Sequence, residues 1–459
     1  MENLSVYDIV KWCDGEIITE GNEVNISSVC IDSREIKNFS LFIPLNGENT
    51  DGHFFISNAF ENGATASLID VNHEVPDVSD KTIIRVNDTL CALQKIAENY
   101  KKRFNIPVIG VTGSVGKTTT KEMIASVLSI EMDVLKTEGN NNGQIGLPLT
   151  LLDAEKHHEV IVAEMGISKF GEMEKLSNIA RPDIGVITNI GISHIENLKT
   201  KENIREEKLK ILKNYEGKYF LNGDSPLLSK LDKNKFKNTV YFGLNGPYQY
   251  RAEDILSCGQ STEFALVAPD FKENLVIPCI GMHNVYNALA AVSIALDMGM
   301  YLDDIKAGLL NYKGVSMRQE ILDINGISII DDSYNASPDS VKSALAVLRA
   351  VHSKGRNIAV ISDMLELGSN TEKIHYDLGK YIAVEGIDIL ITTGRLAKFI
   401  NQGASDSALP IKTIHCNNND ETAKCVYSIL NPGDKVLVKG SRSMHMDEIV
   451  SSLKENLEL

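Results

Sequence analysis

Residues 108–128, VIGVTGSVGKTTTKEMIASVL, join an apolar strand-like run to a glycine-rich turn and then to a helical pattern. A phosphate-binding loop requires this order of strand, glycine loop and helix. Gly113 and Gly116 let the backbone turn tightly and point its N–H groups inward, and the helix N-terminus adds partial positive charge. Lys117 can reach the outer phosphates of a nucleotide, and Thr118 can hold Mg²⁺. The segment therefore predicts a nucleotide-binding α/β domain.

The loop departs from the strict motif G-x-x-x-x-G-K-[ST] at its first glycine. Position 111 is Val, and the chain offers Gly110 and Gly113 instead. A glycine-rich strand–helix turn with an exposed Lys117 is the alternative interpretation, but the strand, G-K-T-T and the helix together favour a nucleotide site. The loop alone does not distinguish a kinase from an NTPase or a ligase.

Short apolar runs alternate with helical patterns on both sides of the loop, which indicates an α/β fold with a mostly parallel sheet. Such sheets bind ligands beyond the carboxyl ends of their strands. Ser337 is a good N-cap and Pro338 a good first residue for one of the helices. The segments that read as strands are 82–86, 108–113, 158–166, 183–191, 327–332, 357–364, 388–394 and 435–440. The segments that read as helices are 90–104, 118–129, 283–299 and 338–348.

At about 150 residues per domain, a chain of 459 residues suggests three domains. The pattern changes after the strand-like run Thr82–Val86, where Asp88 or Thr89 can cap the next helix. It changes again near Gly314, where a new series of strand–helix units begins. We therefore predict domains at residues 1–86, 87–313 and 314–459.

The composition limits the classes of partner. Lys and Arg number 46 and Asp and Glu 62, so the formal net charge is −16. So acidic a chain is a poor candidate for non-specific binding to nucleic acid or anionic membrane, because phosphate contacts need clustered cations. No signal-peptide pattern opens the chain, and no apolar run reaches the about 18 residues of a membrane span. The seven cysteines are scattered without a C-x-x-C pair, as in reduced thiols. We expect a cytoplasmic protein.

Three candidate metal or charge partners follow the phosphate loop. Glu164 ends a strand of the same predicted sheet, where a carboxylate can hold Mg²⁺ directly or through water; a capping or surface Glu is the alternative. His194 follows a second strand and has Asn189 nearby. A structural role and a role as a ligand are equally open for this histidine. Lys208 lies on a predicted helix, and its spacing alone favours a solvated helix face.

The third block places a polar cluster at a strand end, before a helix N-terminus. Asp331, Asp332, Tyr334 and Asn335 there resemble a ribose or phosphate clamp, and a polar loop capped by Ser337 is the alternative. The segments SDMLELG and VKGSRSMH stand at equivalent strand ends, and each is also compatible with a plain loop.

These segments together resemble the Mur ligases, ATP-dependent enzymes that build the peptide of bacterial cell-wall precursors. The likeness covers nearly the whole chain and is greatest to the branch that adds D-alanyl-D-alanine. The DDSYN and KTTTKE forms separate this branch from ligases that add diaminopimelate or lysine, and no DNPR-type motif occurs. The segments that carry the likeness are 112–119, 117–123, 137–152, 164–166, 283–291, 331–340 and 363–368.

Residues 29–64 are similar to the uridine-nucleotide-binding domain of this branch. That likeness implies that Asp32, Ser33 and Arg34 lie near the UDP group. Further residues of the same pattern are expected to serve loop structure more than contacts. They are Gly47, Asp51, Gly52, His53 and Phe55.

The resemblance also implies an ATP site and two Mg²⁺ sites. Thr118 and Glu164 would hold one ion, and His194 and a carbamylated Lys208 the other. Asn140 and Asn142 would bind substrate, as would Ser33 and Arg34. The catalytic set would be Lys117, His194 and Lys208. The expected ATP contacts are Gly113, Ser114, Val115, Gly116, Lys117, Thr118, Thr119, Asn284, Asn287, Arg318, Asp332 and Tyr334.

The implied reaction activates the terminal carboxylate of UDP-N-acetylmuramoyl-tripeptide as an acyl phosphate, which the amine of D-alanyl-D-alanine then attacks. Asp332 and Tyr334 would join the site as the C-terminal domain closes, with a hinge near Lys313–Gly314. We expect a monomer.

Several positions depart from the family pattern, and they leave the acceptor open. A paralogue that adds D-Ala-D-Lac, D-Ala-D-Ser or an amino acid is one alternative. A nucleotide-binding protein that has lost ligation is another, disfavoured because Lys117, Glu164, His194 and Lys208 are all present. An unrelated kinase or ATPase is disfavoured by the uridine-type first domain. The departures are Gly143, Glu207 before Lys208, Lys210, Ser337 and Ser362.

Overall fold

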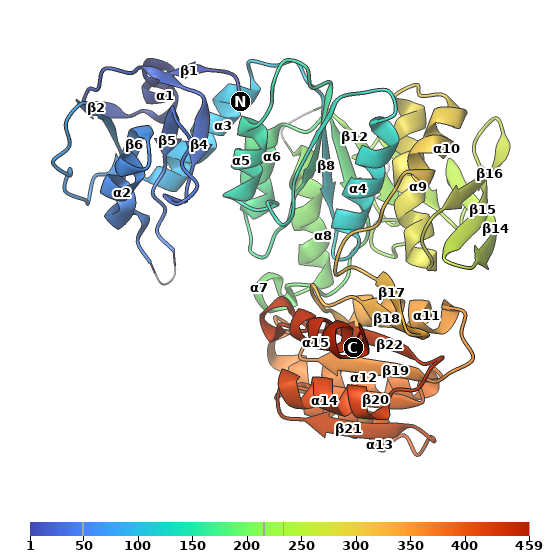
Figure 1. Cartoon of the computed structure of the whole chain (residues 1–459). Coiled ribbons are helices and arrows are strands. Elements are labelled where there is room, and N and C mark those ends of the chain that lie inside the picture. Colours follow the sequence, from blue (N-terminus) through green and yellow to red (C-terminus); the bar gives the residue numbers. More distant parts are fainter. Residues whose placement is uncertain (48–49, 214–215, 233, 459) are drawn as a thin grey trace.

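The structure is a computed structural model that describes residues 1–47, 50–213, 216–232 and 234–458. Three large sheets, each covered by helices, form three bodies (Figure 1). Each body is named from its sheet and includes the helices and loops that flank it. The sheets extend over Glu16–Val86 in the N-terminal module, Val108–Ile277 in the central module and Glu320–Lys439 in the C-terminal module. The predicted three-part α/β fold is confirmed, whereas the boundaries after residues 86 and 313 stay a prediction.

The N-terminal module is built on a five-stranded sheet in the order β2-β7-β6-β5-β4. Its central strand β6 is buried along its whole length, as expected where both faces are covered. The strands are β2 (Glu16–Thr19), β4 (Ser28–Cys30), β5 (Ser40–Phe42), β6 (Ala64–Asp70) and β7 (Thr82–Val86), with β1 (Leu4–Ser5) paired to β3 (Asn25–Ile26). The helices are α1 (Val6–Cys13), the 3₁₀ turn η1 (Gly52–Phe55) and α2 (Ile56–Glu61).

Helix α3 (Thr89–Lys101) joins the N-terminal module to the central one. Asp88 is its N-cap, because its side chain accepts a hydrogen bond from the N–H of Cys91 at 2.6 Å. The helix ends three residues earlier than the sequence pattern predicts. Its buried face packs against α1, α5 and α6, so the junction between the two modules is a packed one.

The central module has a nine-stranded sheet in the order β16-β15-β14-β13-β12-β11-β8-β10-β9. The strands from β9 to β13 run parallel, and β14, β15 and β16 add an antiparallel meander that the sequence pattern did not predict. The strands are β8 (Val108–Thr112), β9 (Val134–Lys136), β10 (Val160–Glu164), β11 (Ile184–Ile187), β12 (Lys218–Asn222), β13 (Thr239–Gly243), β14 (Tyr250–Cys258), β15 (Ser261–Val267) and β16 (Lys272–Ile277).

Helices α4 (Lys117–Leu128) and α9 (Met282–Asp297) cover one face of this sheet (Figure 1). A third helix, α10 (Leu302–Leu310), approaches so closely that a Cβ on Gly308 would lie 2.5 Å from the Cα of Val127. The remaining helices are α5 (Gly146–Leu152), α6 (Glu172–Ala180), α7 (Ile195–Leu198), α8 (Lys201–Leu209) and η2 (Lys210–Leu212).

The C-terminal module has a six-stranded sheet in the order β17-β18-β22-β19-β20-β21, parallel except for β17. Ser337 caps α11 as predicted, in a reciprocal capping box with Ser340. The strands are β17 (Glu320–Ile324), β18 (Ile327–Asp331), β19 (Asn357–Ser362), β20 (Ile389–Thr393), β21 (Lys412–Cys416) and β22 (Lys435–Lys439). The helices are α11 (Pro338–Ala350), η3 (Gly368–Asn370), α12 (Thr371–Val384), α13 (Ala397–Ser405), α14 (Asn419–Ile429), η4 (Arg442–Met444) and α15 (Asp447–Glu458).

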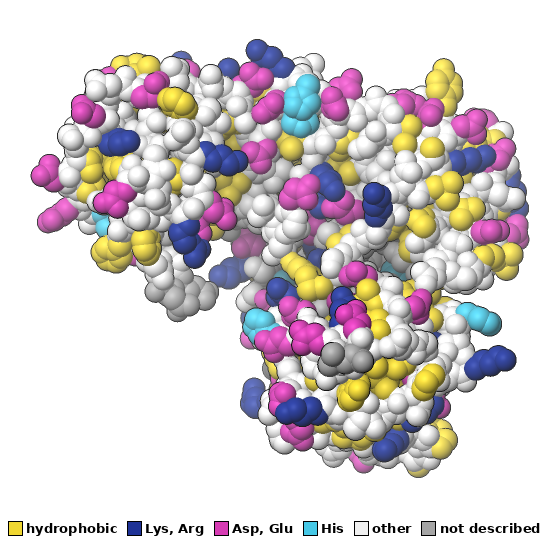
Figure 2. Space-filling model, in the orientation of Figure 1, with side chains coloured by type: hydrophobic (Ala, Val, Ile, Leu, Met, Phe, Trp, Pro, Cys, Tyr) yellow, Lys and Arg dark blue, Asp and Glu magenta, His cyan; other side chains and the backbone are white. Residues whose placement is uncertain are grey.

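Lys and Arg side chains on the face shown in Figure 2 are interspersed with Asp and Glu. They form no continuous basic patch on that face, in keeping with the acidic composition. Within the residues that the structure describes, no helix has the length and hydropathy of a membrane span.

Candidate active site

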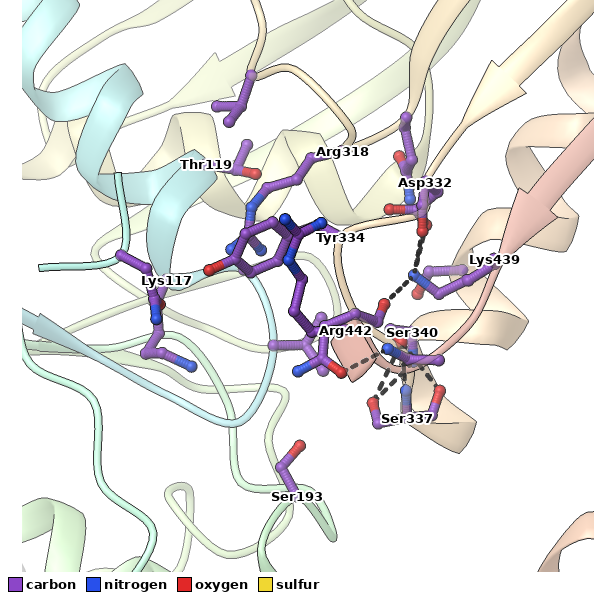
Figure 3. Close-up of a pocket in the computed structure, with 18 of the residues that line it drawn as sticks. Lys117, Thr119, Ser193, Arg318, Asp332, Tyr334, Ser337, Ser340, Lys439 and Arg442 are labelled. Carbon is purple, nitrogen blue, oxygen red and sulfur yellow. Dashed lines mark hydrogen bonds and ion pairs between the residues drawn. The ribbon is translucent and has the colours of Figure 1, made fainter. Parts of the chain in front are cut away.

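A cavity of about 1120 Å³ lies between the carboxyl ends of the central strands and the C-terminal module. We call it the central cavity. It brings together residues that the sequence spreads over more than 300 positions, and Figure 3 shows part of its wall. The predicted site residues that line it are Ser114, Val115, Gly116, Lys117, Thr119, Asn140, Asn142, Glu164, His194, Asn284, Asn287, Arg318, Asp332 and Tyr334.

The phosphate loop has the shape that its glycines predict. Gly116 has a φ of +84° and leads directly into α4, and a Cβ there would meet Oδ1 of Asn287 at 2.9 Å. At Gly113, a Cβ would lie 1.8 Å from Oγ1 of Thr188. Oδ1 of Asn189 accepts hydrogen bonds from the N–H groups of Ser114 and Val115, at 3.0 and 2.9 Å. The neighbouring strand end therefore shapes the loop.

Two lysines meet at the carbonyl of Gly113. The Nζ atoms of Lys117 and Lys208 donate to this oxygen over 3.2 and 3.0 Å. Burial lowers the pKa of both lysines, and that of Lys208 falls well below its usual range because the Lys117 charge adds to the effect. The buried Lys208 amine is therefore a neutral nucleophile more readily than a surface lysine is.

The expectation of a solvated helix face for Lys208 is wrong, because this side chain is only 3% exposed. The charged run around it misled the pattern argument. Helix α8 is short and ends inside the module, so Ile204, Glu207, Lys208 and Leu209 all turn inward.

Glu164 stands at the end of β10 and is 1% exposed. One carboxylate oxygen, Oε1, accepts a hydrogen bond from Nδ2 of Asn142 at 2.8 Å. The other, Oε2, is buried and has no hydrogen-bond partner among the described residues. A buried carboxylate oxygen that lacks a donor is costly unless a cation balances it. Together with the buried hydroxyl-bearing Thr118, Glu164 therefore fits a Mg²⁺ site.

His194 follows β11 and has a left-handed backbone, with a φ of +59°. Its Nδ1 lies 2.5 Å from Oε2 of Glu366, which belongs to the C-terminal module. This contact lowers the pKa of the Glu366 carboxyl. The DMLELG segment was expected at a strand end, but Glu366 was given no role, because nothing local in the sequence links it to His194.

The C-terminal module adds an aromatic ring between two guanidinium groups. The guanidinium carbon of Arg318 lies 4.1 Å from the centre of the Tyr334 ring, and that of Arg442 lies 5.7 Å away (Figure 3). Cation–π contacts of this kind hold a ring in place without covering its edge. Arg318 and Tyr334 were expected here from the family resemblance, whereas Arg442 was not.

Asp332 is paired, because Nζ of the buried Lys439 lies 2.7 Å from its Oδ2 (Figure 3). Lys439 also donates to the carbonyl of Asn335 at 2.8 Å. One lysine at the end of β22 thus fixes both ends of the loop that carries Tyr334. Sequence reasoning read the VKGSRSMH segment only as a strand end, so it missed Lys439.

The two asparagines of α9 are bonded to each other and to α4. Nδ2 of Asn287 donates to Oδ1 of Asn284 at 3.2 Å, and Oδ1 of Asn287 accepts from Thr120 at 2.9 Å. Nearby, His283 lies 2.7 Å from Oε1 of Gln319, and burial lowers its pKa to about 4. A neutral His283 thus links α9 to the segment that enters the C-terminal module.

The predicted uridine residues lie in the N-terminal module and do not line the central cavity. Arg34 is held by Asp32, with Nη2 at 2.6 Å from Oδ2, and its side chain is 84% exposed. Ser33 is buried, and its carbonyl accepts a hydrogen bond from Asn62 at 2.8 Å. Their predicted role in binding the donor stays a prediction.

Three family models match the chain in order. The model described as "Mur ligase family, catalytic domain" matches residues 25–101. The "Mur ligase middle domain" matches residues 111–295, and the "Mur ligase, glutamate ligase domain" matches residues 317–442.

Two relatives match at nearly full length. The chain is 39% identical over 436 residues to the UDP-N-acetylmuramoyl-tripeptide–D-alanyl-D-alanine ligase of Bacillus subtilis, covering 94% of each chain. It is 33% identical over 460 residues to the ligase of the same name from Synechocystis, covering 98% of this chain and 97% of the relative.

Solved structures also match at nearly full length. A crystal structure of MurF from Acinetobacter baumannii superposes with a TM-score of 0.90 at 29% identity, over 99% of each chain. The MurF ligase of Thermotoga maritima, solved in complex with ADP, gives a TM-score of 0.83 at 29% identity, over 94% of this chain and 98% of that one.

Proposed function

The chain belongs to the Mur ligase family of ATP-dependent ligases, and on that premise we propose that it joins D-alanyl-D-alanine to UDP-N-acetylmuramoyl-tripeptide. One observation carries the proposal: a phosphate loop and a buried carboxylate, one of whose oxygens has no hydrogen-bond partner among the described residues, line one cavity that the C-terminal module completes. The buried Lys208 bonds to the same loop at Gly113. Relatives that are named for this reaction match the chain at nearly full length.

The reaction begins with the terminal carboxylate of the tripeptide and the γ-phosphate of ATP. A bond forms between a carboxylate oxygen and the γ-phosphorus, the bond to the bridging β–γ oxygen breaks, and ADP leaves. The amine of D-alanyl-D-alanine then attacks the acyl carbon of the acyl phosphate. A tetrahedral intermediate collapses, the bond from carbon to the phosphate oxygen breaks, and phosphate and a proton leave.

The residues of the phosphate loop bind and position the reactants rather than form covalent bonds. The amides of residues 114–117 and the ammonium of Lys117 face the phosphates and offset the repulsion between two anions. The oxygen-bearing ring edge of Tyr334 faces the same cavity from the C-terminal side (Figure 3). Closure about Lys313–Gly314 excludes water, which would otherwise hydrolyse the acyl phosphate.

Bound Mg²⁺ would supply positive charge to the phosphates of the nucleotide. Thr118 and Glu164 would hold one ion. His194 and Lys208 would hold the second. Oε2 of Glu164, which has no hydrogen-bond partner in the described part of the chain, supports the first assignment, and the half-buried position of His194 at the same cavity supports the second.

Lys208 would serve as a carbamate. Its uncharged Nζ attacks the carbon of CO₂, a bond forms between nitrogen and carbon, a proton leaves the nitrogen, and the neutral amine becomes an anionic carbamate. The lowered pKa of the buried amine supports this step, since only the neutral amine reacts. The charges of Lys117 and Glu164 both act on the Lys208 amine, so they would also act on the new anion.

We assign the donor to the N-terminal side. Ser33 and Arg34 would bind its uridine diphosphate, and Asn140 and Asn142 would bind the part that reaches the central cavity. Asn142 also donates a hydrogen bond to Glu164, so a residue assigned to the donor substrate lies next to the proposed Mg²⁺ site. The enzyme would act in the cytoplasm, as a monomer.

The test is phosphate release from ATP and Mg²⁺ with UDP-N-acetylmuramoyl-tripeptide, together with product masses. Turnover that needs both this donor and D-alanyl-D-alanine is the expected result. Turnover with D-Ala-D-Lac, D-Ala-D-Ser or a single amino acid instead would keep the ligase and replace the acceptor. ATP binding without turnover with any of them would contradict the proposal and favour a protein that has lost ligation.

A further inference from the structure

Lys121 is fully buried on helix α4 and takes no part in the chemistry above. It lies one helical turn beyond Lys117, on the same face. We propose that Lys121 is a positioning residue for the reaction: it fixes both Glu164 and the loop that carries Asn140 and Asn142. The inference rests on the proposed function, because it concerns the sites for Mg²⁺ and the donor.

The first link joins α4 to the end of β9. Nζ of Lys121 donates a hydrogen bond to the carbonyl of Thr137. Thr137 directly follows β9 and is itself fully buried, and its N–H donates to the carbonyl of Val162 on β10 at 3.1 Å. Lys121 therefore ties the helix of the phosphate loop to the point where the chain leaves the sheet.

The second link joins that point to Glu164. The hydroxyl of Thr137 accepts a hydrogen bond from the N–H of Glu164 at 2.9 Å. Thr137 is thus held by Lys121 through its carbonyl and holds Glu164 through its side chain. A shift of Thr137 would move the backbone of the proposed Mg²⁺ ligand directly.

The third link closes a ring through the donor-facing loop. This loop, residues 138–145, begins after Thr137, and Nδ2 of Asn142 donates to Oε1 of Glu164 at 2.8 Å. The carbonyl of Asn142 accepts from the N–H of Gly166 at 2.8 Å. The loop is therefore attached to the β10 strand end at one point and, through Thr137, to Lys121 at the other.

The buried ammonium has a cost that an apolar residue would not have. Glu122 offsets part of it, because its Oε1 lies 2.6 Å from Nζ of Lys121. Lys136 pairs with the other oxygen of Glu122 at the same distance. Burial raises the pKa of Glu122, but these two lysines outweigh it and hold the pKa below its usual range. Since Lys121 does not line the central cavity, contact with substrate does not explain it.

The test compares three variants. Lys121→Met keeps the aliphatic volume and removes the ammonium, and with it both the hydrogen bond to Thr137 and the ion pair with Glu122. Glu122 keeps Lys136 as its second partner. Lys121→Arg is the conservative variant. Lys136→Met is the matched control, because it removes the other partner of Glu122 and leaves Thr137 untouched. Its side chain, 33% exposed, also lies 3.8 Å from the exposed Glu138, and an ion pair so open to solvent contributes little to the order of the loop.

The first measurement needs no activity. Hydrogen–deuterium exchange in the ligand-free protein should speed up by about 10-fold over residues 137–145 in Lys121→Met, because a hydrogen bond at the base of the loop is lost. Exchange of this segment should stay at the wild-type rate in Lys136→Met. The unfolding temperature should change little in either variant.

The second measurement distinguishes an effect on the Mg²⁺ and donor sites from an effect on the nucleotide site. In Lys121→Met, the Mg²⁺ concentration for half-maximal activity and the KM for the donor should rise by about 10–100-fold. The Kd for ADP without Mg²⁺ should change by less than about 3-fold, since the loop amides remain. Lys121→Arg should recover part of the loss. Lys136→Met should resemble the wild type.

Three outcomes would overturn the inference. One is wild-type exchange and kinetics in Lys121→Met, and another is an equal effect of Lys136→Met. The third is a uniform loss of ADP binding and thermal stability, which would mean a purely structural lysine. If the wild-type protein itself fails to ligate, the proposed function falls, while the exchange data still decide whether Lys121 holds the loop.

Discussion

Oε2 of Glu366 lies 2.5 Å from Nδ1 of His194, and the two residues belong to different modules. Both have left-handed backbones, with φ of +60° and +59°, a conformation that non-glycine residues adopt at a cost. The N–H of Glu196 also donates to the carbonyl of Glu366 at 3.2 Å. The contact is a close approach of charge rather than an aligned hydrogen bond, and it occupies the Nδ1 side of the ring and leaves Nε2 for another partner. A carboxylate on the far nitrogen of a metal-binding histidine occupies the same side of the ring.

Glu366→Gln should therefore weaken metal binding without damaging the nucleotide site. The amide keeps the size of the side chain but loses the charge that orients and polarises His194. The Mg²⁺ concentration for half-maximal activity should rise by about 10-fold. Titration of Mn²⁺ by electron paramagnetic resonance should show the same shift in the absence of turnover. An unchanged Mn²⁺ affinity would mean that the contact serves domain docking alone.

Lys117→Ala should abolish turnover and leave the fold intact. Its ammonium contacts only the carbonyl of Gly113 within the described residues, so no packed core depends on it. Loss of a cation at the transferred phosphoryl group should lower kcat by at least about 10²–10³-fold. Phosphate release measures the loss of turnover, and thermal unfolding of the same variant checks that the fold is intact. Wild-type-like activity would remove the phosphate-loop assignment.

His73 in the N-terminal module predicts a pH dependence of stability. Its Nδ1 lies 2.7 Å from Oδ1 of Asp70, and its Nε2 lies 2.8 Å from Oδ2 of Asp51. Ionised carboxylates only accept hydrogen bonds, so both ring nitrogens donate and the ring is an imidazolium. The hydrogen bond to Asp70 raises the pKa of His73 above its ordinary value of 6.5. Burial raises the pKa of Asp51, but its bonds to His53 and His73 lower it to about 2.

The direction in which stability changes with pH follows from these two pKa shifts. The folded state holds the His73 proton more tightly, so this stabilisation is complete below pH 6.5 and is lost as the pH rises through the raised pKa. The Asp51 contribution is present above its ordinary value of 3.8 and is lost as the pH falls towards 2. The free energy of unfolding, measured across this pH range, should fall at both the acidic and the alkaline end. In His73→Asn the fall at the alkaline end should disappear. A wild-type fall at the alkaline end in that variant would contradict the assignment.

Asp51, His53 and His73 also have the composition of a metal site. The rings of His53 and His73 are stacked, with centres 3.8 Å apart and planes within 3° of parallel. A metal ion binds an imidazole nitrogen in the plane of the ring, so one ion does not serve two stacked rings well. A chelator should leave the unfolding temperature unchanged. A fall after chelation would favour a metal over the proton-bound cluster.

Local patterns predicted the parts of the fold that neighbouring residues decide. The strand Thr82–Val86, the Ser337 cap and the phosphate loop each depend on residues within a few positions of one another. The antiparallel strands β14, β15 and β16 were missed because their pairing continues a parallel sheet that is assembled from distant strands. Their polar, partly exposed residues gave no clear strand signal.

The candidate site, too, combines residues that a local sequence signal predicts with residues that only long-range contacts bring together. Glu164 was found because a carboxylate at a strand end is a local signal, and Lys208 only through resemblance, because its burial depends on how α8 ends. Lys439 lies 107 positions from Asp332, and Glu366 comes from another module than His194. No spacing rule links residues so far apart, so these pairs became visible only in the folded structure.

Lys208→Ala should be inactive, and a short carboxylic acid such as acetate should restore part of the activity. The alanine leaves a space beside the carbonyl of Gly113, where Nζ of Lys208 now donates at 3.0 Å. A small carboxylate can occupy that space and supply the anion that the carbamate would provide. Phosphate release against acetate concentration measures the rescue, with Lys117→Ala as the control that acetate should not rescue. Full activity of Lys208→Ala without any added acid would rule out the carbamate.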